Sequence, residues 1–283
     1  MTFVRFRSLF SLRPASHGRP RAAFRACGLL FAALGAQRRR TQAAFHAGLA
    51  AAAVVAAAVA LAPAVSGQAA TDNTLTAAEQ SAGWQLLFDG KTIEKWRVNN
   101  GAGIPANWSV ADGAITAAKG PGSDLVSVDE FGDFELAVDF KVARNGNSGV
   151  FYRGVEAKGE PIYHSAPEFQ VIDNDGHPDA KNGPDRFCGG NYALDPPAPA
   201  SACKPAGEWN SARLVVKGAH VEHWLNGTKV VEYELWSEKW KGQVAASKFK
   251  AWPAYGMAKA GRLGLQAHGD EVAFKNLKIR TLK

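Results

Sequence analysis

Residues 134–142 alternate between apolar and polar or small side chains, and this pattern restricts the fold more than any other feature of the chain. The apolar side chains share one parity: Phe134, Leu136, Val138, Phe140 and Val142. A period of two is typical of a β-strand with one buried face. The sequence therefore predicts a strand over these residues and a sheet that is covered on one side.

Shorter segments repeat the same kind of signal. Residues 221–235 are predicted to form a hairpin, because Asn226-Gly227 suits the positive φ angles of a type I′ turn. Further strands are predicted at 169–172, 214–216, 263–265 and 274–279. Thr76 and Glu79 have capping-box spacing, which predicts a short helix. Many short strands and few helices indicate an all-β fold, an antiparallel β-sandwich.

The first 69 residues differ sharply from the rest. They contain nine arginines, no lysine and no acidic residue, and an apolar run at 47–65 ends in small residues. We interpret residues 1–69 as a leader with a secretory signal peptide, followed by one domain at 75–283. The expected location is periplasmic or secreted, without stable membrane insertion after signal removal. A membrane anchor is the alternative, since the run approaches the roughly 20 residues that span a bilayer.

Charge narrows the range of partners. Without the nine leader arginines, the 33 basic residues fall to 24 against 26 acidic residues, a net charge of −2. No basic surplus is left to neutralise phosphates, which argues against nucleic acid as a partner. Cys188 and Cys203 remain as an even pair, and in an oxidising compartment we expect a disulfide between them. A metal pair is the weaker interpretation, because no adjacent ligand accompanies either sulfur.

Several strands carry polar or aromatic side chains opposite their apolar ones. Alternation predicts that seven of these side chains point away from the apolar face of their strand: Arg153, Glu168, Gln170, Glu222, Trp224, Gln266 and His268. An ordinary solvated sheet face is one interpretation. The mixture of Arg, Gln, His, Glu and Trp favours a face that binds a polyol. By the same parity, His223 falls on the apolar side and is interpreted as a core residue.

The usual catalytic motifs are missing. A retaining glycosidase needs two carboxylates about 5–5.5 Å apart, yet Glu168 is followed by Gln170 where a second carboxylate would stand. The loop 173–179 is rich in side-chain oxygens that could bind a cation, but it lacks the spacing of a calcium-binding loop. Asp and Asn residues are also common in turns, where their side chains make local hydrogen bonds.

Seven segments, in order, resemble the 3-keto-disaccharide hydrolase family, and together they extend from about Leu75 to Leu282. The segments are 83–91, 147–153, 167–174, 207–210, 223–227, 247–249 and 265–269. The resemblance implies a concanavalin-like or laminin-G-like jelly roll with the site on a concave sheet. It also implies a sugar substrate whose C3 hydroxyl an upstream glycoside 3-dehydrogenase has oxidised to a ketone.

The resemblance also implies site residues. Carried over by motif, these are Arg153, Glu168, Gln170, Asp173, Lys248 and His268. We expect catalytic roles for His268, Glu168 and Lys248, and substrate binding by Arg153, Gln170, Asp173, Trp224 and Gln266. A divalent metal is possible, with Glu168 and His268 as candidate ligands. Relatives often have Asp where this chain has Ala267, although alternation points Ala267 toward the core.

A ketone at C3 explains how a glycoside can be cleaved without paired carboxylates. It acidifies the C2 hydrogen, so a base such as His268 or Glu168 can form an enolate that expels the glycosidic oxygen, and water then adds. Arg153, Lys248 or a metal would stabilise the oxyanion. The alternative function is a non-catalytic carbohydrate-binding or adhesion module, with Trp224, Trp252 and Tyr255 as its aromatic platform.

Overall fold

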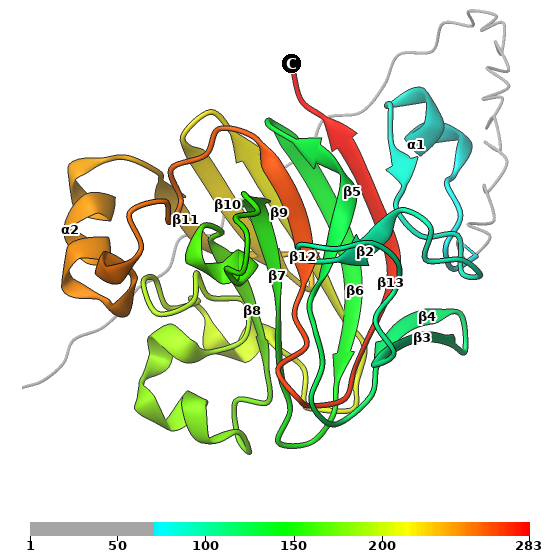
Figure 1. Ribbon diagram of the computed structural model, residues 1–283, viewed down its shortest axis with the longest axis horizontal. Coiled ribbons are helices and arrows are strands. Elements are labelled where there is room, and N and C mark those ends of the chain that lie inside the picture. The colour runs from blue at the N-terminus through cyan, green and yellow to red at the C-terminus, as the bar shows by residue number, and fades with distance from the viewer. Residues whose placement is uncertain (1–70) are drawn as a thin grey trace, which may run out of the picture. The chain divides into compact units, whose positions relative to one another are not determined.

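The computed structural model describes residues 71–283, which form two antiparallel sheets (Figure 1). The larger sheet has eight strands, namely β1 (Gln85–Leu86), β3 (Trp108–Ala111), β4 (Ala114–Ala117), β6 (Phe134–Val142), β9 (Asn210–Lys217), β10 (His220–Leu225), β11 (Thr228–Glu234) and β13 (Val272–Thr281). The smaller sheet has five, namely β2 (Trp96–Val98), β5 (Leu125–Phe131), β7 (Asn147–Gly154), β8 (Glu168–Ile172) and β12 (Gly261–Leu265).

The core lies between these sheets. Strand β6 occupies the predicted residues, and its even-numbered side chains are buried. Phe140 of β6 meets Phe169 of β8 edge-to-face, with ring centroids 6.3 Å apart. Apolar side chains from both sheets join one cluster. The predicted all-β antiparallel sandwich is therefore confirmed.

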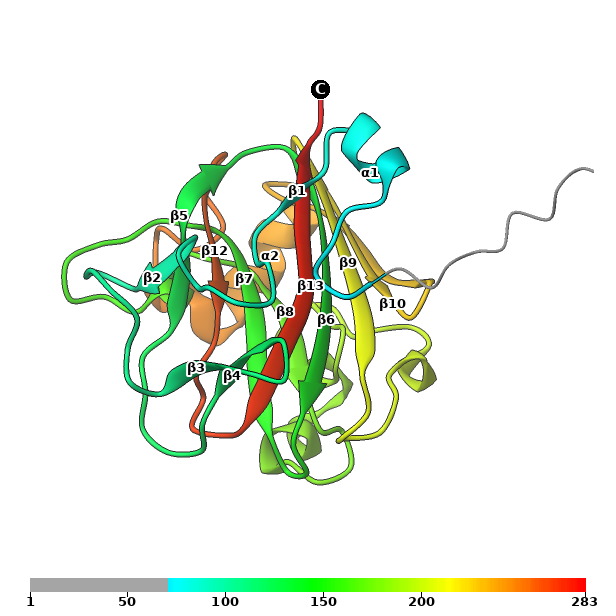
Figure 2. The same ribbon diagram turned by 90° about the vertical axis from the view of Figure 1, so that its right-hand side faces the viewer.

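The order of strands is 11-10-9-6-13-4-3 in the larger sheet and 2-5-12-7-8 in the smaller one. Strand β1 pairs with β13, beside which it lies in Figure 2. The helices are α1 (Ala77–Ser81) and α2 (Glu238–Ala246), which lie on different sides of the sheets in Figure 1. Short 3₁₀ turns occur at Ile162–His164, Pro178–Asn182, Pro184–Arg186, Ala200–Ala202 and Lys248–Ala251.

Two local predictions are confirmed. Asn226 and Gly227 have φ angles of 49° and 82° and join β10 to β11, as a type I′ turn requires. The Thr76 hydroxyl accepts a hydrogen bond from the Glu79 N–H, and the Glu79 carboxylate accepts one from the Thr76 N–H. This capping box begins α1.

The folded contacts begin slightly before the predicted boundary at residue 75. Asn73 and Asn276 exchange hydrogen bonds of 2.6 and 2.8 Å between backbone N–H and side-chain oxygen. Asp72 also pairs with Lys275 at 2.6 Å. The predicted leader and signal peptide lie outside the described residues. Among the residues described, no helix is long and apolar enough to cross a membrane.

The predicted disulfide is not formed in the structure. Cys188 is buried and Cys203 is half-buried, and both are free thiols. Burial and the neighbouring Cys203 thiol raise the pKa of Cys188. The Cys203 thiol donates a 3.4 Å hydrogen bond to the Lys204 carbonyl. The two sulfurs are therefore neighbours in reduced form, and a bond between them stays a prediction for the oxidised protein.

We expect protein purified from an oxidising compartment to carry this bond, since it would close a loop that has little regular structure. Thiol labelling under denaturing, non-reducing conditions should then leave Cys188 and Cys203 unmodified. The same chain made in a reducing cytoplasm is the control and should label at both. Two labelled thiols in the exported protein would contradict the prediction.

Candidate active site

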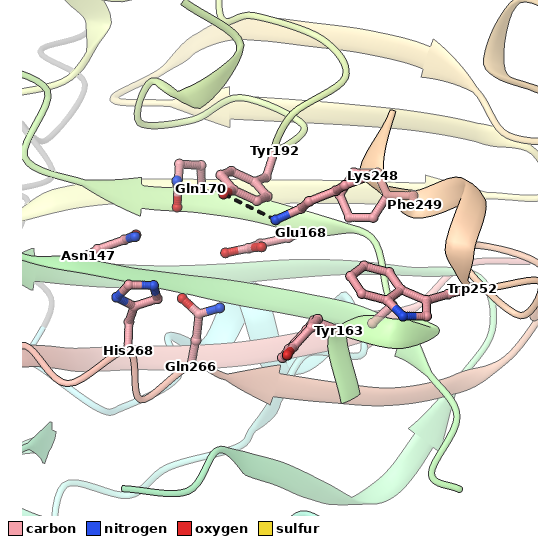
Figure 3. A pocket seen from close by; sticks show the side chains of 11 residues that line it. Asn147, Tyr163, Glu168, Gln170, Tyr192, Lys248, Phe249, Trp252, Gln266 and His268 are labelled. Atoms are coloured by element: carbon pink, nitrogen blue, oxygen red, sulfur yellow. Dashed lines mark hydrogen bonds between the residues drawn. The ribbon is translucent and has the colours of Figure 1, made fainter. Parts of the chain in front are cut away.

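A cavity of about 330 Å³ lies on the outer face of the smaller sheet (Figure 3). This volume is at the lower end of the range for small-molecule sites. Its walls come from β7, β8, the segment after β12 and covering loops, and they consist of Asn147, Tyr163, Ala166, Glu168, Gln170, Tyr192, Lys248, Phe249, Trp252, Gln266 and His268. Five of the eight predicted catalytic and substrate-binding residues line it: Glu168, Gln170, Lys248, Gln266 and His268.

Strand β8 directs two of these side chains into the cavity. Phe169 and Val171 pack in the core between the sheets, so Glu168 and Gln170 face the other way, as the alternation predicts. The neighbouring strand leaves space for them. A Cβ atom on Gly149 of β7 would lie only 2.1 Å from the Glu168 Oε1 atom. Any larger residue at position 149 would displace the Glu168 carboxyl group.

The Glu168 carboxyl group is buried, and burial raises its pKa to about 8, although Lys248 acts in the opposite direction. Glu168 therefore holds a proton at neutral pH and can donate a hydrogen bond. Figure 3 shows it between Lys248 and Gln266. Burial likewise lowers the pKa of Lys248.

Tyr192 positions the Lys248 ammonium. The Lys248 Nζ atom donates to the Tyr192 hydroxyl at 3.3 Å and lies 4.3 Å from the ring centroid. The Tyr192 hydroxyl in turn donates to Asp179 at 2.9 Å. This chain of contacts holds a cation at the cavity wall beside Glu168.

Three amide side chains present buried polar atoms that have no hydrogen-bond partner in the part of the chain that the structure describes. These are Gln170 Nε2, Gln266 Oε1 and Asn147 Oδ1, and all three residues line the cavity. Buried polar groups are normally hydrogen-bonded, because an unpaired one costs about 1–3 kcal/mol. One donor and two acceptors in one cavity fit the hydroxyl groups of a polyol.

Four aromatic side chains also line the cavity: Tyr163, Tyr192, Phe249 and Trp252. Trp252 stacks on His164, with ring centroids 4.1 Å apart. These aromatics reach the cavity from loops, and alternation within strands could not have found them. Asn147 was also missed as a site residue, although it shares a parity with Gly149 on β7.

His268 belongs to a second group of polar side chains at the cavity. The Asp270 Oδ2 atom lies 3.9 Å from His268 Nδ1 and 3.8 Å from His177 Nε2. The ligand atoms of these three residues lie within 4.8 Å of one another. Two imidazoles and a carboxylate suit a divalent transition metal. Of the two predicted metal ligands, His268 is in this group and Glu168 is not.

Arg153 does not line the cavity, contrary to the prediction. Its φ angle is 50°, so the end of β7 leaves the regular alternation. The buried guanidinium donates to the carbonyls of Gly132 and Gly218 and to the Asp133 carboxylate, at 2.8–3.0 Å. Arg153 therefore connects β7 of the smaller sheet to the β5–β6 turn between the sheets and to the β9–β10 turn of the larger sheet.

Trp224 and Asp173 were also misplaced. Trp224 lies on the outer face of the larger sheet, 4.1 Å below the Arg213 guanidinium, and donates to Glu222 at 2.7 Å. Asp173 accepts hydrogen bonds from the N–H groups of Asn145 and Asp175, and so stabilises a turn. Neither residue lines the cavity.

His223 is a core residue, as predicted. It is fully buried, donates to the Gly189 carbonyl at 3.0 Å and contacts the Tyr152 hydroxyl. Burial lowers its pKa to about 4, so the imidazole is neutral.

Comparison with known proteins assigns the family. The sequence profile described as the 3-keto-alpha-glucoside-1,2-lyase-like domain matches residues 83–280. The chain belongs to this family. A 3-keto-disaccharide hydrolase of Bacteroides thetaiotaomicron is 38% identical over an alignment of 244 positions, which covers 76% of this chain and 84% of that protein. As predicted, the chain is an enzyme that acts on glycosyl bonds.

Solved structures agree with this assignment. A putative glycosyl hydrolase of Parabacteroides distasonis is 37% identical and superimposes with a TM-score of 0.71, covering 75% of this chain and all of that one. A second such protein from the same organism is 28% identical, with a TM-score of 0.54 over 70% of this chain and 99% of that one. Both matches support the sandwich architecture of the family.

The placement of Arg153 predicts a structural role. Arg153→Met should lower the free energy of unfolding by about 1–3 kcal/mol, because the buried guanidinium loses its hydrogen bonds to the carbonyls of Gly132 and Gly218 and to the Asp133 carboxylate. Arg213→Met is the matched control, since the Arg213 side chain is 38% exposed, and should cost less than about 1 kcal/mol. Urea unfolding measures both. An unchanged midpoint with lost turnover in Arg153→Met would restore Arg153 to the site.

Proposed function

We propose that this enzyme cleaves 3-keto-glycosides by elimination and hydration, with net hydrolysis of the glycosidic bond. The observation that carries the proposal is the composition of the cavity. Of the described residues that line it, Glu168 is the only acid, and it is protonated at neutral pH beside Lys248. The similar enzyme of Bacteroides thetaiotaomicron, named a 3-keto-disaccharide hydrolase, supports the same substrate class.

The composition disfavours direct displacement at the anomeric carbon. A retaining glycosidase needs an ionised carboxylate nucleophile and a second carboxyl group close to it. An inverting one needs a carboxylate base as well as an acid. One protonated carboxyl group cannot fill two roles at once. A ketone at C3 removes this need, because the C2–H bond then becomes acidic enough for a single base.

The proposed roles follow from the side chains. His268 accepts the C2 proton, and the enolate oxygen at C3 receives hydrogen bonds from the Glu168 carboxyl group and the Lys248 ammonium. The C1–O bond then breaks, and the leaving oxygen takes up the proton from the His268 imidazolium. Water adds across the C1=C2 bond, so the products are a 3-keto sugar and a free hydroxyl compound. Burial lowers the pKa of His268, which leaves its imidazole unprotonated.

A divalent metal fits the group formed by His177, His268 and Asp270. When bound there, it would supply a Lewis acid for the substrate oxygens. His268 would then be a ligand and not the base, so the two roles are alternatives for this side chain. Glu168, Lys248 and the unpaired amides of Gln170, Gln266 and Asn147 bind and orient the sugar in either case. Turnover with and without a chelator tests whether the metal is required.

We also propose that the protein works outside the cytoplasm with an oxidised sugar supplied by an upstream glycoside 3-dehydrogenase. The arginine-rich leader and the apolar run at 47–65 support export. The need for a pre-formed ketone supports the partner. Intact-mass analysis of the periplasmic fraction tests the export, and a full-length chain retained in membranes would contradict it.

The alternative function, a non-catalytic carbohydrate-binding module, would need an aromatic platform, but the three proposed residues do not lie together at the cavity. Trp224 lies on the other sheet. Tyr255 is 2% exposed and stacks on Phe249, with ring centroids 3.9 Å apart. Trp252 alone of the three proposed platform residues lines the cavity.

Glu168→Gln and His268→Ala should each lower the single-turnover rate on a 3-keto-glucoside by about 10²- to 10⁴-fold, the usual cost of losing a positioned acid or base. Trp224→Ala is the control on the opposite sheet and should keep the wild-type rate. The matched glucoside without the ketone should not react, because its C2 hydrogen is not acidified. Equal cleavage of both substrates, or near-wild-type rates in both site variants, would refute the elimination mechanism.

Glu168 also predicts a pH dependence of stability. Its pKa is 4.5 in an ordinary environment and about 8 in the fold. Between these pH values the folded state binds one proton more than the unfolded state. The stabilisation of the fold by protonated Glu168 is therefore complete below about pH 4.5 and is lost as pH rises through about 8. Glu168→Gln has no carboxyl group to titrate, so this loss should be absent. The free energy of unfolding of Glu168→Gln minus that of the wild type should be roughly 2–4 kcal/mol larger at pH 8 than at pH 5. Urea unfolding at several pH values measures both free energies of unfolding. If they changed with pH by the same amount in the wild type and in Glu168→Gln, Glu168 would not be buried and protonated.

A further inference from the structure

Tyr192 connects the two titratable side chains at the centre of the cavity, Glu168 and Lys248. Its backbone N–H donates to the Glu168 carbonyl at 3.1 Å, so the residue is fixed beside strand β8. Its hydroxyl accepts a hydrogen bond from the Lys248 Nζ atom, which Figure 3 marks with a dashed line. Tyr192 therefore fixes the position of the ammonium relative to that of the acid.

Asp179 determines the direction of the Tyr192 hydroxyl. A tyrosine hydroxyl has one hydrogen to donate, and its oxygen can also accept. Here the hydrogen goes to the Asp179 Oδ2 atom at 2.9 Å. Burial and the hydrogen bond to Asp179 raise the pKa of Tyr192, so the hydroxyl keeps this hydrogen at neutral pH. Only its lone pairs are then left for Lys248, whose ammonium can only donate.

The Asp179 carboxylate is itself held in place. Its Oδ1 atom accepts a hydrogen bond from the Asn182 Nδ2 group at 2.9 Å, within the same 3₁₀ turn. The Arg186 guanidinium lies 4.9 Å from the Tyr192 ring centroid, and the Lys248 ammonium lies 4.3 Å from it. Two cations therefore contact one phenol ring, and the carboxylate bonded to that phenol supplies the negative charge that offsets them.

Lys248 needs such support because a lysine ammonium ends a long and flexible side chain. The 3₁₀ turn that begins at Lys248 fixes only the backbone of this residue. A donor that stabilises an oxyanion is effective when it is already held where the charge develops. Misplacement of such a group by about 1 Å can cost about 10²-fold in rate.

We infer that Asp179 and Tyr192 are positioning residues of the reaction, which act through Lys248 and hold its ammonium where the enolate oxygen forms. The inference rests on the proposed function, in which Lys248 and Glu168 stabilise that oxygen. Asp179 does not line the cavity, so its effect has to pass through Tyr192.

Two substitutions interrupt this chain of contacts at different points. Tyr192→Phe removes the hydroxyl and keeps the ring beside Lys248. Asp179→Ala removes the acceptor and keeps the Asp179 backbone N–H, which contacts the His177 side chain. Asn182→Ala is the matched control, because it removes the other hydrogen bond of the Asp179 carboxylate from an exposed position.

The readout is the single-turnover rate on a 3-keto-glucoside, measured with Lys248 present and in a Lys248→Met background. With Lys248 present, Tyr192→Phe should lower the rate about 10- to 100-fold and Asp179→Ala about 5- to 50-fold, as loss of a hydrogen bond to a charged group implies. Asn182→Ala should stay within about twofold of the wild type.

Lys248→Met itself should lower the rate about 10²- to 10³-fold, as loss of an oxyanion donor does. In this background, Tyr192→Phe and Asp179→Ala should change the remaining rate less than about twofold, because the group that they position is absent. Urea unfolding checks that each variant is folded. If Tyr192→Phe is not, Asp179→Ala decides the test.

Equal losses in both backgrounds would overturn the inference, because Asp179 and Tyr192 would then not act through Lys248. Wild-type rates in Tyr192→Phe and Asp179→Ala, or in Lys248→Met, would overturn it as well. So would a loss in Asn182→Ala as large as that in Asp179→Ala, since the whole turn would then be needed. If the wild type failed to cleave the 3-keto-glucoside, the proposed function would fail and the inference with it, so wild-type turnover distinguishes the two failures.

Discussion

The chemistry of the site depends on one constraint, which is that the smaller sheet is covered on both faces. Its inner face packs against the larger sheet, and loops close over part of its outer face, where Val126, Phe151, Ile162 and Ala166 form a second apolar cluster. Between this cluster and the loop residues, the Glu168 carboxyl group loses contact with water. Its raised pKa follows from that burial. A solvated outer face would leave Glu168 ionised and unable to donate a proton.

Period-two patterns predicted much of this arrangement. The alternation in β6 gave the strand its observed limits, and the alternation around Glu168 and Gln170 placed both side chains opposite the core. Such inferences succeed because the side-chain direction in a regular strand depends on local geometry alone. The turn at Asn226-Gly227 was predictable for the same reason.

Alternation failed where direction depends on distant parts of the chain. A sandwich has two outward faces, and parity could not tell that Trp224 belongs to the sheet opposite Glu168. Arg153 adopts a positive φ, which reverses its expected direction. His177 and His268 come together with Asp270 only through the folding of two separate loops, so no spacing in the sequence predicted that group.

Ala267, where relatives often have Asp, lies outside the group of reacting side chains. Ala267 packs partly against the core and does not line the cavity that holds Glu168, but with Asp124 it lines a neighbouring cavity of about 320 Å³. A carboxylate at this position would lie near Asp124, which already accepts the Ala267 N–H. Two acids in one partly buried cavity would repel each other when ionised. Alanine therefore avoids this repulsion and leaves Asp124 as the one acid among the described residues that line this neighbouring cavity.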